Sequence, residues 1–276
     1  MIIGIDIGST TTKAVAIDHG AVITTIRTKA CDAITSATGA LGKIIVESGY
    51  EISSVEKIFV TGAGAVNIKG DIFGIPTSKI EEFRAIGLGG IFLSQKETNS
   101  KPGSVIIANI GTGTSIIEAT GDKITHLGGT GVGGGTITGL SKELLNATDF
   151  DHILELAKKG DISKVDLLIE DISDSKISFL SGKSTAANFG KMLDSACKED
   201  LALGIITLVF QVIGVIAVFA AKSRGASSVM VTGNGSKNMV GRIILNNISD
   251  LYGITFNFPQ DAEYATAIGA ALSACE

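Results

Sequence analysis

One pattern is present twice in this chain, first in IIGIDIGSTTTKAVAIDHGAV from Ile2 and again in VIIANIGTGTSIIEATGDKI from Val105. Each copy has an apolar run containing one polar residue, then Ile-Gly, a turn rich in hydroxyl groups, a second apolar run, a tight turn and a third strand-like run. Short apolar runs joined by tight turns predict an antiparallel meander. Two such units in one chain predict a duplicated α/β domain with a cleft between the copies.

Helical and strand-like segments alternate along the rest of the chain. Apolar residues at helical spacing predict helices over residues 32–48, 79–98, 137–147, 151–159, 201–222, 236–251 and 262–274. Short strands are predicted at 57–62, 227–236 and 254–258. We expect an N-terminal half over residues 1–100 and a C-terminal half over 101–276, with a polar, irregular excursion at 160–185.

Length and composition limit the classes of protein to which this chain can belong. Its 276 residues, 45% of them hydrophobic and 18% charged, are typical of a globular protein with ample length for a core. The net charge is −5 and no basic run is present, which argues against nucleic-acid binding. Cys31, Cys197 and Cys275 form no disulfide framework, so we expect a reducing, cytoplasmic compartment. The N-terminal MIIGIDIGSTTTK lacks the features of a signal peptide.

The segment LALGIITLVFQVIGVIAVFAA, residues 201–221, is almost entirely apolar around Gln211 and is long enough to span a bilayer. The alternative is a helix buried on most sides inside a large protein or a dimer. There is no second candidate span and no aromatic belt, and the flanking residues carry both signs of charge. These features favour the buried helix and argue against a membrane partner.

Asp6 lies inside an otherwise apolar strand, where an unpaired carboxylate is costly. Either turn hydrogen bonds satisfy it, or it is a metal ligand. Residues 8–13, GSTTTK, follow directly and offer backbone N–H groups, hydroxyls and one cation, Lys13, which either binds phosphate or is simply solvated. The second copy offers similar donors over residues 109–114. Two facing hairpins of this kind suit a triphosphate between them, with Mg²⁺ near Asp6.

Two other motifs resemble phosphate-binding signatures but do not qualify as such. SGKST at residues 181–185 resembles the end of a P-loop, but Ile177 stands where that motif requires a glycine. The glycine run HLGGTGVGGGTITGL at residues 126–140 formally contains GxGxxG, but no clear βαβ unit surrounds it. A dinucleotide-binding fold is therefore not favoured.

The motifs DIGSTTTK, ANIGTGTS, LGGTGVGGGTITGL, TAANFG and VTGNGS, in this order, resemble those of the type II pantothenate kinases. The resemblance extends from Met1 to the C-terminal AEYATAIGAAL. It implies the duplicated ribonuclease-H-like (actin-like ATPase) fold of the acetate and sugar kinase, Hsp70 and actin superfamily. It also implies a homodimer that transfers the γ-phosphoryl group of ATP to the primary hydroxyl of pantothenate, the first step of coenzyme A synthesis. The resemblance further implies that an acyl-CoA could bind as a feedback ligand of the enzyme.

The resemblance assigns roles to individual residues. The catalytic base of these kinases is a glutamate followed by phenylalanine at the start of a helix, which corresponds to Glu82 in IEEF; the sequence alone does not separate it from Glu81. A positioned carboxylate can accept the proton that a primary alcohol loses as it attacks phosphorus. Nucleotide contacts are implied at Asp6, Gly8, Ser9, Thr10, Thr11, Lys13, Thr112, Gly134, Gly135, Thr136, Ile137, Thr138, Phe150 and Asn234, substrate contacts at His126 and Asn188, and a Mg²⁺ ligand at Asp6.

By the same resemblance, the glycine run brings bare backbone close to the nucleotide, where side chains would clash. The helix that starts at the end of the run would turn its N-terminal amides toward phosphate oxygens.

The chain departs from the family pattern at His126, where bacterial and animal members have an arginine near the substrate. A neutral imidazole cannot give the fixed bidentate charge of a guanidinium. Asn234, in place of a serine, is a milder difference. Two alternatives therefore stand beside a pantothenate kinase: a kinase of the same superfamily for another small alcohol, such as an amino sugar, and a non-catalytic ATP-binding homologue. An activator ATPase of acyl-CoA dehydratases would need cysteines that bridge an iron–sulfur cluster, and the three cysteines here do not have that arrangement.

Overall fold

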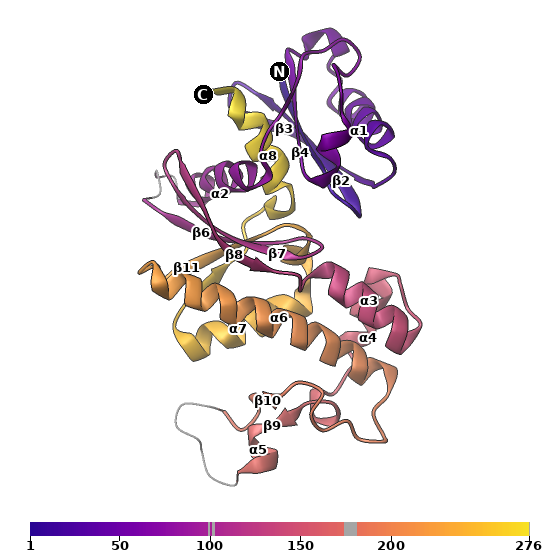
Figure 1. The fold of residues 1–276 in the computed structure, drawn as a ribbon, viewed down its shortest axis with the longest axis vertical. Coiled ribbons are helices and arrows are strands. Elements are labelled where there is room, and N and C mark those ends of the chain that lie inside the picture. The colour runs from indigo at the N-terminus through magenta and orange to yellow at the C-terminus, as the bar shows by residue number, and fades with distance from the viewer. Residues whose placement is uncertain (99, 101–102, 174–180, 276) are drawn as a thin grey trace.

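The structure, a computed structural model, describes residues 1–98, 100, 103–173 and 181–275. Its first sheet contains β1 (Ile2–Ile7), β2 (Thr11–Asp18), β3 (Ala21–Lys29), β4 (Lys57–Thr61) and β5 (Thr77–Lys79) in the order β3-β2-β1-β4-β5. The first three strands form the predicted antiparallel meander, and β4 and β5 are parallel to β1. This sheet forms the upper half of the molecule in Figure 1.

The second sheet repeats this arrangement. It contains β6 (Val105–Ile110), β7 (Thr114–Thr120), β8 (Lys123–Thr130), β11 (Ser228–Thr232) and β12 (Thr255–Asn257) in the order β12-β11-β6-β7-β8. Again a meander of three strands is extended on its first strand by two parallel strands. The prediction of a duplicated, actin-like ATPase fold is confirmed.

The duplication extends to the glycines that follow β4 and β11. Gly62 and Gly233 both have a positive φ, of 83° and 77°, which favours glycine. A Cβ at Gly62 would lie 2.5 Å from Asp6 Oδ1, and one at Gly233 would lie 2.9 Å from Asn109 Oδ1. Each glycine therefore lets one strand end close to the polar residue of the neighbouring strand, in both halves.

The helices cover and join the two sheets. The α-helices are α1 (Ala33–Ser48), α2 (Glu82–Thr98), α3 (Gly134–Leu145), α4 (Phe150–Ala157), α5 (Ile169–Ile172), α6 (Lys198–Ser223), α7 (Met239–Tyr252) and α8 (Ala265–Leu272), and short 3₁₀ helices lie at η1 (Ile52–Ser54), η2 (Ala63–Asn67), η3 (Ile162–Lys164), η4 (Asn234–Lys237), η5 (Ala262–Tyr264) and η6 (Ser273–Cys275). Helix α1 covers the first sheet, and α6 and α7 cover the second (Figure 1). The last helix, α8, returns to lie on β1, where it also contacts α2.

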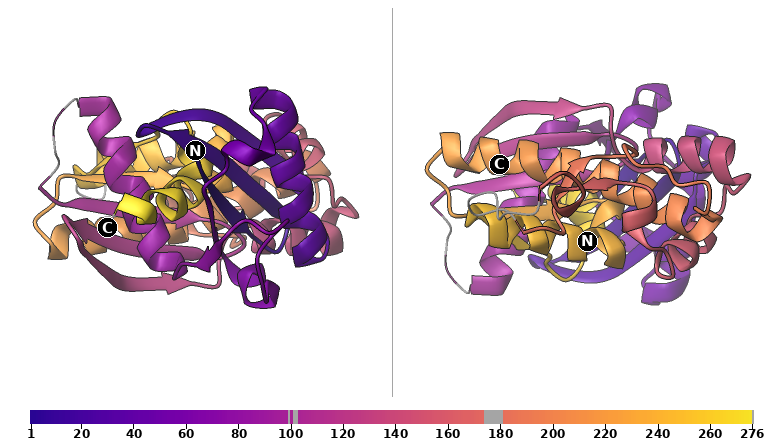
Figure 2. Two further views of the ribbon diagram at one scale, coloured as in Figure 1. Left: turned by 90° about the horizontal axis from the view of Figure 1, so that it is seen from above. Right: turned by 90° about the horizontal axis from the view of Figure 1, so that it is seen from below.

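Helices α2 and α8 lie directly against each other (Figure 2). Their contact leaves no room for side chains at two positions. A Cβ on Gly89 would lie 1.8 Å from the Ala265 carbonyl oxygen, and one on Gly269 would lie 1.8 Å from the Ala85 carbonyl oxygen. Because α2 also packs on β6 and β7 and α8 on β1 and β2, this crossing joins the two halves.

Helix α6 is the long apolar segment singled out in the sequence. By length and composition it could cross a membrane, yet 61% of its most apolar window is buried inside the protein. It packs against α3, α4 and α7. The amide of Gln211, inside the helix, also has a structural partner: its Oε1 accepts a hydrogen bond of 2.9 Å from Asn188 Nδ2. The observed packing is that of a core helix.

Some elements were not predicted. The edge strand β5 is missing from the predictions because TSK is short and polar. The strands β9 (Leu167–Leu168) and β10 (Thr185–Ala187) were also not predicted; each is only two or three residues long, and they pair at the predicted irregular excursion and its end. The predicted boundary near residue 100 falls partly on residues 99 and 101–102, which lie outside the described residues.

Candidate active site

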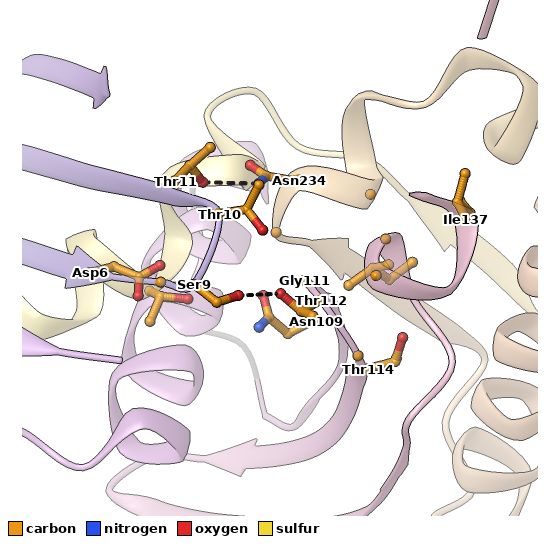
Figure 3. Close-up of a pocket in the computed structure, with 18 of the residues that line it drawn as sticks. Asp6, Ser9, Thr10, Thr11, Asn109, Gly111, Thr112, Thr114, Ile137 and Asn234 are labelled. Atoms are coloured by element: carbon orange, nitrogen blue, oxygen red, sulfur yellow. Dashed lines mark hydrogen bonds between the residues drawn. The ribbon is translucent and has the colours of Figure 1, made fainter. Parts of the chain in front are cut away.

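A cavity of about 600 Å³ lies between the two meanders. The turns after β1 and β6 enter it from opposite sides (Figure 3). Among the residues with predicted roles, those that line it are Asp6, Gly8, Ser9, Thr10, Thr11, Lys13, Glu82, Thr112, Gly134, Gly135, Ile137, Thr138, Phe150 and Asn234. The fold thus brings together residues that are far apart in the sequence.

The two halves touch through polar side chains at this cavity. Ser9 Oγ and Thr112 Oγ1, one from each hydroxyl-rich hairpin, are 2.7 Å apart. Asn234 Nδ2 donates a hydrogen bond of 3.1 Å to Thr11 Oγ1 (Figure 3). The hydroxyl groups of both hairpins therefore face one common space, as two facing phosphate-binding turns require.

Asp6 is a buried carboxylate with a cation beside it. Its exposed fraction is 8%, and its Oδ2 lies 3.8 Å from Lys13 Nζ. Burial raises the pKa of Asp6, and the charge and hydrogen bonding of Lys13 oppose that shift. At the equivalent place in the second half, Asn109 Oδ1 accepts a hydrogen bond of 3.0 Å from Thr232 Oγ1. Only the first half thus carries a charge on the first strand of its meander.

Asp6 also fits a magnesium site of the kind that nucleotides complete. Among the described residues, no group of three or more His, Cys, Asp or Glu side chains could hold a metal alone. Mg²⁺ usually binds through one or two carboxylates together with substrate phosphates and water. One buried carboxylate on the cavity wall meets that requirement.

The structure distinguishes Glu82 from Glu81. The carboxylate of Glu81 accepts hydrogen bonds from the backbone N–H groups of Phe83, at 3.1 Å, and Arg84, at 2.8 Å, and so caps the start of α2. Glu82 is the first residue of α2, and its side chain lines the cavity. Of the two, only Glu82 is placed to meet a ligand there.

Glu82 remains accessible to solvent in the cavity, but its surroundings disfavour its charged form. Partial burial raises its pKa, and the negative charges of Asp6 and Glu81 raise it further, while Lys13 lowers it. A carboxylate whose pKa is shifted toward neutrality is a better proton acceptor than an ordinary one.

The glycine run packs closely against the second hairpin, while Gly134 and Gly135 also line the cavity. A Cβ at Gly133 would lie 2.6 Å from the Thr112 carbonyl oxygen, and one at Gly129 would lie 2.6 Å from the Thr114 carbonyl oxygen. The N–H groups of Gly134 and Gly135 donate hydrogen bonds of 2.9 Å to the carbonyl oxygens of Gly111 and Thr112. The expectation that the start of α3 offers free amides to phosphate is therefore wrong for this structure. The glycines instead let α3 begin directly against the second hairpin.

Three residues with predicted roles do not line this cavity. Thr136 Oγ1 accepts a hydrogen bond from Gly133 N and donates one to the Gly131 carbonyl oxygen, so it braces the start of α3. Asn188, just after β10, donates from its Nδ2 to Asp166 Oδ2 and to Gln211 Oε1 of α6.

The third is His126, which is exposed on β8. Its ring stacks on Phe83, with the ring centres 4.1 Å apart and an angle of 3° between the planes. Since Phe83 directly follows Glu82, His126 lies beside the start of α2.

The sequence analysis did not identify two cations that line the cavity, Arg27 and Lys237. Arg27 is the register partner of Lys13 in the pairing of β2 with β3. Counting back across the tight turn at His19-Gly20 would have given Ile26 instead, because a bulge between Ala16 and Ile17 shifts the register by one residue. Lys237 follows VTGNGS, but nothing in the sequence distinguishes it from a solvated surface lysine.

A model of the Fumble family matches residues 18–272. The chain is 32% identical to a type II pantothenate kinase of Oceanobacillus iheyensis over 225 residues, covering 80% of this chain and 84% of the relative. Among solved structures, the activator of the 2-hydroxyisocaproyl-CoA dehydratase of Clostridium difficile with bound ADPNP aligns with a TM-score of 0.66 at 20% identity, covering 99% of this chain and 93% of that one. The ROK hexokinase of Thermus thermophilus aligns with a TM-score of 0.56 at 13% identity, covering 99% of this chain and 97% of that one. These two likenesses concern the fold.

Proposed function

The chain belongs to the Fumble family, and on that premise we propose that it is a type II pantothenate kinase that transfers the γ-phosphoryl group of ATP to the primary hydroxyl of pantothenate. The observation that carries the proposal is the position of Glu82. Its carboxylate lines the same cavity as the hydroxyl groups of both hairpins and as Asp6. A base and a polyphosphate site that share one space are what phosphoryl transfer to an alcohol requires.

In this proposal the chain's own residues act by position and charge. The Glu82 carboxylate accepts the proton of the attacking hydroxyl. The hairpin donors and Lys13 hold the phosphates. Asp6 would hold Mg²⁺, which neutralises phosphate charge when it is bound with the nucleotide. The division into halves at residue 100 remains part of the proposal.

Phosphate transfer from Mg-ATP to labelled pantothenate tests this function directly. Turnover by the purified protein supports the proposal. ATP binding without any transfer to pantothenate, in a preparation that is folded by circular dichroism, contradicts it.

We expect the rate to fall at low pH because Glu82 must be ionised to accept a proton. The groups that face it are Asp6, Glu81 and Lys13, and together with partial burial they raise its pKa. The acidic limb of kcat/KM should therefore lie above the ordinary glutamate value of about 4.3. Rates measured from about pH 4 to about pH 9, a range that includes the ordinary glutamate pKa and values well above it, check this prediction. A profile that stays flat down to the ordinary glutamate range contradicts it.

A second candidate function, phosphorylation of another small alcohol, is favoured by His126. The stack of its imidazole on Phe83 replaces a fixed guanidinium near the start of α2. A panel of small alcohols, including amino sugars, separates the two candidates by kcat/KM.

If pantothenate is the substrate, His126→Arg should improve its use. A guanidinium can pair with the pantothenate carboxylate and still stack on Phe83. A charge-assisted pair of this kind lowers KM by about tenfold or more. The KM for ATP should stay unchanged, because His126 does not line the cavity. His152→Arg on α4 adds the same charge at another exposed histidine and is the control. An unchanged pantothenate KM would place residue 126 outside the substrate site.

The proposal also includes three properties implied by the family resemblance and the composition: the protein is a homodimer, it is cytoplasmic, and an acyl-CoA regulates it by feedback. Exposed apolar side chains on two helices that pack together support the homodimer: Phe219 of α6 is 61% exposed, and Met239 and Ile243 of α7 are 54% and 60% exposed. Light scattering at several protein concentrations tests the oligomeric state.

A further inference from the structure

Glu263 is a buried carboxylate between two cations that come from different parts of the chain. It lies in η5 and is 7% exposed. Its Oε1 is 3.0 Å from Lys237 Nζ, and its Oε2 is 3.8 Å from Arg27 Nη1. Arg27 belongs to β3 of the first sheet, and Lys237 ends η4, which follows β11 of the second sheet. The carboxylate therefore holds one cation from each half.

Both cations face the cavity as well as Glu263. They line its wall, and their side chains are 55% and 56% exposed, for Arg27 and Lys237 respectively. The distance of 3.8 Å from Arg27 to Glu263 is longer than a hydrogen bond, and Glu263 Oε2 has no hydrogen-bond partner. Glu263 thus restrains the guanidinium by charge without saturating its donors. Arg27 keeps N–H groups for a ligand in the cavity.

The position of the two cations indicates which part of a ligand they would meet. Arg27 is paired in register with Lys13, on the strand that leaves the first hairpin. Lys237 is in the same 3₁₀ helix as Asn234, whose amide reaches Thr11 of that hairpin. Both therefore lie close to the hydroxyl groups that would hold phosphates. Two cations at such a place favour a ligand with several negative charges.

We propose that Arg27 and Lys237 bind the phosphates of a nucleoside triphosphate from the two halves of the protein, and that Glu263 is the positioning residue that keeps both cations at the cavity. This deepens the proposed function and rests on it. The competing interpretation is that the three side chains only tie the halves together. In that case their loss would weaken every ligand of the cavity alike, whereas phosphate binding predicts a loss confined to phosphorylated ligands.

Calorimetric titration with Mg-ATP and with adenosine, in the absence of pantothenate, separates these interpretations. We expect Arg27→Gln and Lys237→Gln each to weaken ATP binding by about ten- to hundredfold, the effect of losing a charge-assisted hydrogen bond. Adenosine binding should be unchanged. Arg27→Lys, which keeps the charge, should recover most of the ATP affinity.

Lys96→Gln is the matched control. Lys96 Nζ lies 3.3 Å from Oδ2 of Asp261, which is two residues before Glu263 in the sequence. Lys96 does not line the cavity. Its removal deletes a similar ion pair in the same region and should leave ATP binding intact. Each single variant leaves Glu263 with one cation, and thermal unfolding confirms that each is folded.

Two results would overturn the proposal. The first is ATP binding by Arg27→Gln and Lys237→Gln at wild-type affinity, which leaves the proposed kinase function standing. The second is an equal loss of ATP and adenosine affinity, which makes the cluster a purely structural tie. A folded wild-type protein that binds no ATP would instead overturn the proposed function, and this inference with it.

Discussion

Replacing Glu82 with glutamine is expected to lower kcat for phosphoryl transfer by ~10²–10⁴-fold, the usual contribution of a positioned general base. The amide has nearly the same size but cannot accept the proton of the attacking hydroxyl. Because Glu82 begins α2 and is solvent-accessible, the substitution should not change the stability of the fold. Initial rates with saturating Mg-ATP and pantothenate, together with ATP affinity by calorimetry, give the comparison.

Glu81→Gln is the control for this variant, because it changes the adjacent carboxylate in the same way. Glu81 caps α2 by accepting hydrogen bonds from the backbone, and a glutamine oxygen can still accept one of them. Its activity should stay near that of the wild type. If Glu82→Gln retains full activity, or if Glu81→Gln loses more activity than Glu82→Gln, the assignment of the base is wrong.

Replacing Gly269 with alanine should destabilise the protein by about 3 kcal/mol or more, at the upper end of the usual cost of overpacking. The added Cβ would lie 1.8 Å from the Ala85 carbonyl oxygen, and backbone cannot move aside as a flexible side chain can. The effect is large against a typical total stability of about 5–15 kcal/mol. The midpoint of urea unfolding, followed by circular dichroism, measures it.

Gly39→Ala in α1 is the matched control for Gly269→Ala. Gly39 is exposed inside a helix, and a Cβ there would meet nothing within 4 Å. Alanine restricts the unfolded chain and favours the helix, so this variant should gain about 0.5–1 kcal/mol. If both variants change stability equally, the close contact between α2 and α8 is not what makes Gly269 necessary.

The sequence predicted the parts of the fold that depend on local pattern. The meanders, α1 and α6 follow from apolar spacing and turn residues, which are visible over a few positions. The strand β5 was missed because Thr77–Lys79 is polar and is defined only by its pairing with β4.

The candidate site could be predicted only where a motif names a residue. Glu81 and Glu82 are chemically identical in the sequence, and only the cap of α2 separates them. Arg27 and Lys237 became visible once the halves were placed side by side. The glycine run was predicted from the family motif as a ligand contact, and Gly134 and Gly135 do line the cavity. Its backbone also meets residues 111–114, a long-range approach that no local pattern encodes.

The crossing of α2 and α8 affects the position of Glu82, the proposed base. The contact at Gly89 lies seven residues from Glu82, or about 10 Å along the helix axis. A turn of about 5° at that crossing would therefore swing Glu82 by about 1 Å, a displacement large enough to cost a reaction about a hundredfold in rate. Helix α2 therefore acts as a rigid arm that pivots where its backbone touches the backbone of α8. Because backbone meets backbone at this crossing, with no side chains there that could adopt other rotamers, we expect small relative motions of the two halves to displace Glu82, the proposed base.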